Sequence, residues 1–306
     1  MFQYIVRRFL NLIPVWVGVL VLTFLIMHLT PGDPARMVAG ADAAPETILQ
    51  IRAQLGLDQP LLAQFLRYVG NVLRGDFGRS YHTGEPVFAE IGWRYRNTAI
   101  LSVVSLCVAT VIGVTAGGLA ARFPYSLTDT ISMIIALIGI STPVFWLGLI
   151  LMYVFGVYLG WLPTGGSGTW QHLILPSVTL GLAMAGIIAR MTRSSLLEVI
   201  HLDYIRTAKA YGFPDNVVVY KYALRNAILP VLTIVGLQLG YSLAGAVLTE
   251  TVFAWPGLGR LIVNSIFSRD YPTIQAGLLW VSVTFTLVNF AVDVLYSLAD
   301  PRIRYE

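Results

Sequence analysis

Residues 130–189 read TISMIIALIGISTPVFWLGLILMYVFGVYLGWLPTGGSGTWQHLILPSVTLGLAMAGIIA, and no Asp, Glu, Lys or Arg occurs between Asp129 and Arg190. A helix that crosses the roughly 30 Å of bilayer hydrocarbon needs about 20 apolar residues. The run is long enough for two crossings, and the segment PTGGSG at 163–168 supplies a turn between them. This stretch predicts an all-α integral membrane protein.

The rest of the chain has the same character. Of its 306 residues, 56% are hydrophobic and 12% are charged, and the mean hydropathy is +0.72. Soluble domains carry about twice that charged share. The formal net charge is +4, and every basic residue except Lys209 and Lys221 is arginine. A basic chain can bind nucleic acid, but in one this apolar the charge is typical of cytoplasmic loops of a membrane protein.

Six apolar segments are long enough to span the bilayer. They cover approximately residues 9–29, 99–121, 131–158, 173–189, 228–250 and 274–299. The first is too long for the apolar region of a signal peptide, and no small-residue cleavage site follows it. We therefore expect six transmembrane helices, with the first retained as an anchor.

The arginines predict the orientation of these helices. Arg7 and Arg8 favour a cytoplasmic N-terminus, and an even number of crossings returns Arg302 and Arg304 to the same side. Segment 190–225, between the fourth and fifth spans, is then cytoplasmic, and its excess of basic residues agrees with this. Both termini are predicted to be cytoplasmic.

Residues 30–98 form a long loop that is predicted to lie outside the cytoplasm. A loop of this length is largely exempt from the charge rule. Pro45 opens a short helix that stops at Gly56, and a second helix follows Pro60 and ends near Gly75. Each has one apolar face, which we expect to pack on the membrane domain or on the other helix.

Small residues recur at every fourth position in three spans, which lets helix backbones approach closely. They are Ala109, Gly113, Gly117 and Ala121; Gly181, Ala185 and Ala189; and Gly236, Gly240 and Ala244. These stripes indicate either packing within the bundle or an interface with a partner subunit.

Several kinds of catalytic and metal site are not supported by the sequence. No Gly-x-x-x-x-Gly-Lys-Ser/Thr loop is present, so nucleotide hydrolysis would need another chain. The GGSG at 165–168 resembles a serine protease motif in spelling, but no histidine follows His201 to act as a base, so we interpret it as a turn. Cys107 is the only cysteine, and the histidines lack metal-ligand spacing.

Glu250 and Asp293 lie at or inside apolar spans. An ionisable side chain there is costly and is by default a functional candidate that faces a polar pathway. Alternatively, Glu250 snorkels to a membrane boundary, and Asp293 accepts a structural hydrogen bond from a neighbouring helix. Both are candidates for the translocation path, with structural roles as the alternative.

The most specific pattern is DYIRTAKAYG at 203–212, followed by Phe213 and Pro214 and then by LRNAILP at 224–230. It predicts a short helix, a break at Gly212 and Pro214, and a second helix that re-enters the membrane. A compact helix between two spans can insert into a groove on a cytosolic partner.

This stretch resembles the EAA loop of ABC-type importer permeases, whose pattern is Glu-Ala-Ala, then Gly, then Ile-x-Leu-Pro. The corresponding residues are Arg206, Thr207 and Ala208, then Gly212, then Ala227 in place of Ile and Leu229-Pro230. The arginine is typical of the peptide branch, and it removes the acidic contact expected elsewhere.

Further segments resemble the dipeptide, oligopeptide and nickel permease family. Within it, they are most similar to the first permease of dipeptide or glutathione importers. They are Arg7-Arg8, PGDP at 31–34, LGLDQPL at 55–61, GDFG at 75–78, FAWPGLGR at 253–260, RDYP at 269–272, DVLY at 293–296 and DPRIRY at 300–305. The resemblance covers almost the entire chain.

The resemblance implies a type I importer fold in the bacterial inner membrane. It implies an N-terminal region at 1–94, a transmembrane domain at 95–300 with its coupling loop at 190–227, and a cytoplasmic tail at 301–306. The implied partners are a second homologous permease, two ABC ATPases that hold ATP and magnesium, and an extracytoplasmic solute-binding protein. The residues implied to contact the ATPase are Asp203, Tyr204, Arg206, Thr207, Ala208, Gly212 and Pro230.

Two other classes of function are weighed against this one. A proton-coupled secondary transporter would use Glu250 or Asp293 and would show an inverted repeat, which the spelling of the sequence does not reveal. A membrane enzyme needs a nucleophile with a base or a metal cluster, and neither is evident. For an importer, the solute stays open among dipeptides, oligopeptides, glutathione and nickel chelates.

Overall fold

The computed structural model describes residues 2–30, 32–40 and 43–299, and within these ranges every regular element is a helix. The chain divides into two compact units. A central unit comprises Asn97–Gly257 and the chain from Thr284 on, and an N-terminal unit comprises Phe2–Arg96 and Leu258–Val283. Helices α6 (Val87–Arg122) and α15 (Tyr271–Ala299) contribute to both. The predicted tail at 301–306 lies outside the described residues.

Within the described residues, five helices are long and apolar enough to cross a membrane, and a bent pair brings the number to six if it counts as one span. The five are Ile5–Leu29, Val87–Arg122, Gln171–Ile200, Asp215–Ala244 and Tyr271–Leu295. The prediction of six spans is therefore confirmed in number if the bent pair counts as one span.

The third predicted span, at 131–158, is wrong as a continuous helix. It consists of α7 (Leu127–Ser141) and α8 (Val144–Leu151) with the π-helix η1 (Met152–Tyr158), and the two parts meet at 103°. Thr142 is extended, with φ −80° and ψ 126°, because Pro143 disfavours the helical conformation for the residue before it. The fifth predicted span also breaks, since α12 (Leu224–Gly245) ends before α13 (Val247–Val252), which carries Glu250.

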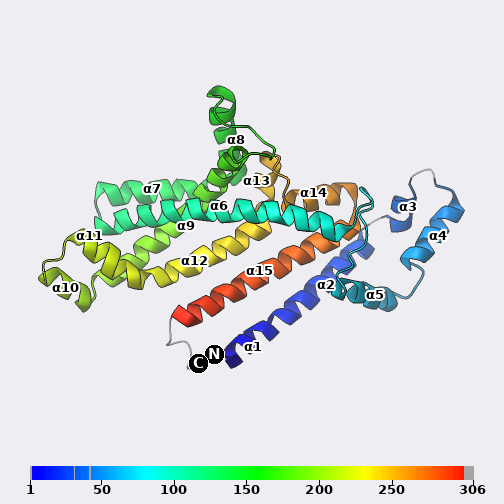
Figure 1. Ribbon diagram of the computed structural model, residues 1–306, viewed down its shortest axis with the longest axis horizontal. Helices are drawn as coiled ribbons and strands as arrows, with labels where there is room; N and C mark the ends of the chain where they lie inside the picture. Colours follow the sequence, from blue (N-terminus) through cyan, green and yellow to red (C-terminus); the bar gives the residue numbers. More distant parts are fainter. Residues whose placement is uncertain (1, 31, 41–42, 300–306) are drawn as a thin grey trace. The chain divides into compact units, whose positions relative to one another are not determined.

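In the central unit, α9 (Gln171–Ile200) packs along α7 and α12, and Figure 1 shows these helices beside one another. The glycine stripes explain how closely α6 and α9 approach. A Cβ at Gly117 would overlap the carbonyl oxygen of Ala189, and one at Gly181 would lie 2.9 Å from the carbonyl oxygen of Ser105. For these glycines the structure shows packing within the chain, which was one of the two predicted alternatives.

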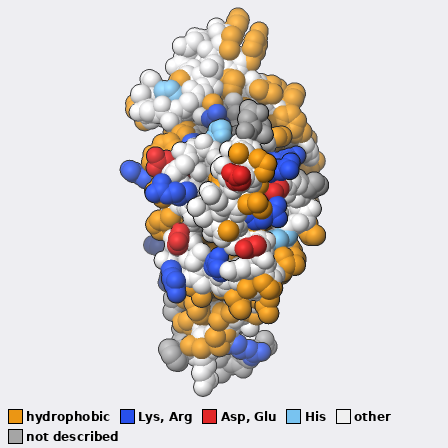
Figure 2. All heavy atoms as spheres, turned by 90° about the vertical axis from the view of Figure 1, so that its right-hand side faces the viewer, with side chains coloured by type: hydrophobic (Ala, Val, Ile, Leu, Met, Phe, Trp, Pro, Cys, Tyr) orange, Lys and Arg blue, Asp and Glu red, His pale blue; other side chains and the backbone are white. Residues whose placement is uncertain are grey.

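The N-terminal unit contains α1 (Phe2–Leu10), α2 (Leu12–Leu29), α3 (Pro34–Ala39), α4 (Pro45–Leu55), α5 (Leu61–Leu73) and α14 (Leu258–Ser268). The predicted folded loop is confirmed, and α4 ends at Gly56 with the left-handed φ of 70°. Figure 2 views the molecule from the right-hand side of Figure 1, where α3–α5 are drawn, and shows basic and acidic side chains interspersed on this face.

The predicted packing of both apolar faces is only partly correct. Phe65 of α5 packs edge-on against Phe24 of α2, with ring centroids 5.3 Å apart. Leu62 and Leu66 on the same helix remain 69% and 62% exposed, and α4 has no buried residue. The reason is that α5 presents a narrow aromatic edge to α2, so the leucines beside it face outward.

Candidate functional site

The predicted short helix in the loop after α9 is present as α10 (Asp203–Ala210). Gly212 lies just beyond its end and has φ +78°. The N–H of Gly212 donates to the carbonyl oxygen of Lys209 at 2.9 Å, and the N–H of Phe213 donates to the carbonyl oxygen of Ala208 at 3.4 Å. This pair of bonds is a Schellman C-cap, which requires a left-handed residue at the position of Gly212. The glycine therefore sets the direction in which the chain leaves α10.

One face of α10 is buried in the central unit. Ile205 is fully buried and Ala208 is 6% exposed, and both belong to a cluster with Leu196 of α9 and Val218 and Ala223 of η2 (Val218–Ala223). Because Ala208 lies on this inner face, it fixes α10 to the bundle and is not available to another protein from the surface.

The opposite face of α10 is open to solvent and is amphipathic. It carries Asp203, Tyr204, Arg206 and Thr207, all exposed. Arg206 lies 3.6 Å from Asp203, but both side chains are exposed, so this ion pair contributes little and leaves the guanidinium accessible. The Tyr204 hydroxyl accepts a hydrogen bond from Nδ2 of Asn226 at 2.8 Å, which ties α10 to α12.

Three large apolar side chains that the sequence interpretation did not single out border this face. Leu202 is 48% exposed before α10, and Tyr211 and Phe213 are 80% and 44% exposed after it. Phe213 also contacts the Tyr222 ring, with centroids 5.4 Å apart. We define the α10 surface as Leu202, Tyr204, Arg206, Thr207, Tyr211 and Phe213. Aromatic residues on both sides of a helix-ending glycine were the available signal.

Pro230, the remaining predicted contact residue, lies elsewhere. It is half-buried inside α12, about two turns beyond the end of η2 at Ala223. A proline within a helix removes one backbone hydrogen bond and favours a bend. The structure thus places Pro230 in the helix that follows the α10 surface and not on the surface itself.

Glu250 is fully buried in α13, where Oε1 accepts a hydrogen bond from Oγ1 of Thr98 in α6 at 2.5 Å. The snorkelling alternative is therefore wrong, because the turn that follows α13 folds back over the carboxylate. In that turn Gly257 lies so close that a Cβ there would overlap the Glu250 carboxylate. Asp293 is half-buried on α15.

The same turn is fastened to α6 by a pair of reciprocal bonds. Nε1 of Trp255 donates to the carbonyl oxygen of Asn97 at 3.1 Å, and Nδ2 of Asn97 donates to that of Pro256 at 3.0 Å. The N–H of Gly166 in the predicted hairpin donates to the carbonyl oxygen of Phe253 at 2.8 Å. The first five residues of the motif FAWPGLGR, 253–257, therefore form a folded turn that encloses Glu250.

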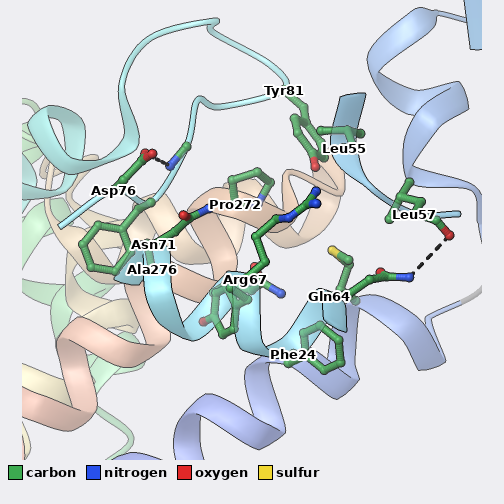
Figure 3. Close-up of a pocket in the computed structure, with 15 residues that line it drawn as sticks. Phe24, Leu55, Leu57, Gln64, Arg67, Asn71, Asp76, Tyr81, Pro272 and Ala276 are labelled. Atoms are coloured by element: carbon green, nitrogen blue, oxygen red, sulfur yellow. Dashed lines mark hydrogen bonds between the residues drawn. The ribbon is translucent and has the colours of Figure 1, made fainter. Parts of the chain in front are cut away.

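A polar cavity of about 200 Å³ occurs in the N-terminal unit. Figure 3 shows Tyr81 and Asp76 of the loop and Pro272 of α15 around the Arg67 side chain of α5. Burial, together with the nearby Asp270 and Tyr271, raises the pKa of Tyr81 to about 12, so the phenol stays neutral at physiological pH. The cavity lining therefore includes one cation, one carboxylate and the phenol hydroxyls of Tyr68 and Tyr81.

Asp270 holds the loop beside this cavity. Its carboxylate is buried and accepts hydrogen bonds from Oγ of Ser80 at 2.5 Å, the N–H of Tyr81 at 3.0 Å and Oγ1 of Thr273 at 2.8 Å. Asp270→Ala would leave three donors without an acceptor, and each buried unpaired donor costs about 1–3 kcal/mol. We expect the variant to lose hydrogen-exchange protection in residues 78–86 and in the first turn of α15.

The matched control is Asp76→Ala, which removes an exposed carboxylate that accepts one bond, from the N–H of Gly78 at 2.9 Å. This variant should keep the protection of wild type in α15. Equal protection in all three proteins, measured by mass spectrometry, would show that Asp270 does not hold the loop.

Within the described residues, no group of three or more His, Cys, Asp or Glu side chains is arranged to hold a metal ion.

Residues 113–305 match the family described as binding-protein-dependent transport system inner membrane component, and residues 1–105 match the N-terminal family of the same components. The glutathione transport system permease proteins GsiC of Escherichia coli K12 and Salmonella paratyphi A are each 50% identical over all 306 residues, which is 100% of both chains.

Among solved structures, a chain of the inward-facing MetNI methionine ABC transporter aligns with a TM-score of 0.60. The alignment covers 71% of this chain and 99% of that one, at 22% sequence identity. At this identity the similarity shows the fold alone.

Proposed function

We propose glutathione or a small peptide as the solute carried by this chain, which belongs to the family of binding-protein-dependent transport system inner membrane components and is a permease subunit of an ABC importer. The observation that supports the solute class is the full-length identity of 50% to glutathione permeases. Membership in this family favours transport driven by ATP over the alternative, a proton-coupled secondary transporter.

We further propose how the importer is assembled around this subunit. An ABC importer includes ATPase and solute-binding partners, and we propose that two ATPases, one binding protein and a second homologous permease complete the complex. In this arrangement the chain forms half of the translocation path, residues 1–94 form the N-terminal region, and 95–300 form the transmembrane domain. ATP is bound and hydrolysed on the partner subunits.

The α10 surface is the proposed contact with the ATPase. It combines exposed aromatic rings and an accessible arginine, the residue types that are enriched in protein interfaces. Ile205 and Ala208 anchor the opposite side of the helix in the bundle. A movement of the ATPase against the α10 surface would therefore be transmitted through these two residues to α9 and η2. We assign Glu250 a structural role, since its carboxylate is enclosed by the turn at 253–257.

Reconstitution in lipid vesicles tests the proposed function. The purified chain alone should release no phosphate from ATP above the blank, because it lacks a phosphate-binding loop. The complex with its ATPases, second permease and binding protein should take up radiolabelled glutathione or dipeptide only when ATP is present. Uptake without ATP, or turnover by the chain alone, would contradict the proposal.

The orientation gives a separate expected result. Reporter fusions at Gly75, Gly165 and Asp270 should report the extracytoplasmic side, and fusions near Pro214 and Glu306 should report the cytoplasm, because the basic segments stay inside. Alkaline phosphatase and green fluorescent protein fusions provide complementary readouts. A cytoplasmic signal at Gly75 would invert the proposed topology.

A further inference from the structure

A groove of about 220 Å³ opens on the central unit between α6, α7 and α9. Its lining contains no charged side chain and includes Ala116, Ile135, Gly139, Leu182 and Gly186. The groove exists because small residues form its floor. A Cβ at Gly186 would overlap the carbonyl oxygen of Ala136, so α7 and α9 touch here while the larger side chains stand at the sides.

The groove offers little to a polar ligand. Of its two hydroxyl-bearing residues, Thr142 already donates its Oγ1 hydrogen to the carbonyl oxygen of Ile138 at 2.7 Å. Ile135 and Ile138 remain 63% and 59% exposed at its rim. Within a span, such an opening suits an alkyl chain, because a bilayer supplies alkyl chains and no water at this depth.

One end of the groove is strongly basic. Arg190 lies one helical turn beyond Gly186, and Arg193 lies one turn beyond Ala189. Arg193 is committed to Asp129, which it binds through Nε at 2.6 Å and Nη2 at 2.7 Å. Arg190 is exposed, and the described part of the chain gives it no hydrogen bond or ion pair.

The helix that forms the other wall adds a second cation at the same end. Arg122 is the last residue of α6, its guanidinium lies 4.8 Å from the centroid of the Phe123 ring, and its Nε is buried without an acceptor in the described residues. Tyr125 follows with 93% of its surface exposed. Arginines and aromatic rings of this kind mark the headgroup level of a membrane.

We propose that this groove binds one acyl chain of an anionic phospholipid, whose phosphate pairs with Arg190. Charge complementarity identifies the ligand, because the apolar groove leads to two cations that Asp129 does not neutralise. Basic pockets between helices on the cytoplasmic side bind anionic headgroups in the same way. The inference rests on the proposed orientation, which places the C-terminal ends of α6 and α9 at the cytoplasmic leaflet.

Electron paramagnetic resonance of spin-labelled lipids tests this in the reconstituted complex with all its subunits. Wild type should associate with labelled phosphatidylglycerol about fivefold more than with labelled phosphatidylcholine, the ratio expected for one arginine beside an anionic headgroup. Arg190→Gln should clearly lower that ratio, and any preference that remains should come from Arg122. Ala116→Phe, which fills the groove, should lower the immobilised fraction of both lipids.

Two variants serve as matched controls. Lys221→Gln removes an exposed cation away from the groove, and Val111→Phe adds a ring at a position on α6 that is 65% exposed and outside the lining. Both should behave as wild type.

Equal association of the two lipids with wild type, or an unchanged ratio in Arg190→Gln, would overturn the proposal. So would release of the second permease by Ala116→Phe with lipid association unchanged, because the groove would then be a protein interface. Solute uptake by the same vesicles is measured separately. Its loss with lipid preference intact counts against the proposed function alone.

Discussion

Gly212→Val should abolish solute uptake and solute-stimulated ATP hydrolysis by the reconstituted importer. The residue has φ +78°, a conformation that costs a β-branched side chain about 1–2 kcal/mol. No atom lies within 4 Å of the position that its Cβ would occupy, so the effect arises from the backbone and not from a clash. Loss of the C-cap changes the angle between α10 and the helix that follows. Uptake and phosphate release in vesicles measure the outcome.

Matched variants separate backbone geometry from surface contact. Gly212→Asn should retain most of the uptake, because asparagine adopts the left-handed conformation more readily than valine does. Thr207→Trp leaves the cap intact but adds bulk to the exposed face of α10, so it should weaken ATPase binding by steric exclusion. Normal uptake by Gly212→Val and Thr207→Trp at normal membrane abundance would show that this loop only connects two helices.

Gly257→Ala should lower the membrane abundance of the subunit severely. The added methyl group would overlap the Glu250 carboxylate, which is fully buried and hydrogen-bonded to Thr98. Overpacking costs about 1–3 kcal/mol, and displacement of the carboxylate from its donor adds about 1–3 kcal/mol. Such a loss is a large part of the stability of a typical domain. Immunoblots of membranes and thermal unfolding of the detergent-solubilised subunit measure it.

A second-site change provides the decisive comparison for this position. Glu250→Asp shortens the side chain by one methylene, so the double variant Gly257→Ala with Glu250→Asp should recover part of the lost abundance. Gly18→Ala in α2 is the control, because no atom lies within 4 Å of the position that a Cβ at Gly18 would occupy. If Gly257→Ala accumulates as wild type does, the turn at 253–257 is not packed against the carboxylate.

The sequence predicted the parts of this protein that depend on local chemistry. Apolar length alone located the spans, because lipid cannot satisfy backbone polar groups and forces each crossing to be helical. A glycine followed by Phe-Pro predicted the end of α10, and the C-cap at Gly212 agrees. Pro143 is the sequence signal for the break in the third span, but the long uncharged run on both sides of it favours one continuous helix.

Other features required contacts between residues that are far apart in the chain. Thr98 and Glu250 are 152 positions apart, and only their hydrogen bond shows that the carboxylate is enclosed and does not snorkel. Likewise, the order of residues in α10 does not reveal that Ala208 faces inward while Tyr211 and Phe213 border the exposed face. Hydropathy therefore determined which segments enter the membrane, and tertiary packing decided which side chains remain available to a partner, since burial depends on neighbours from other helices.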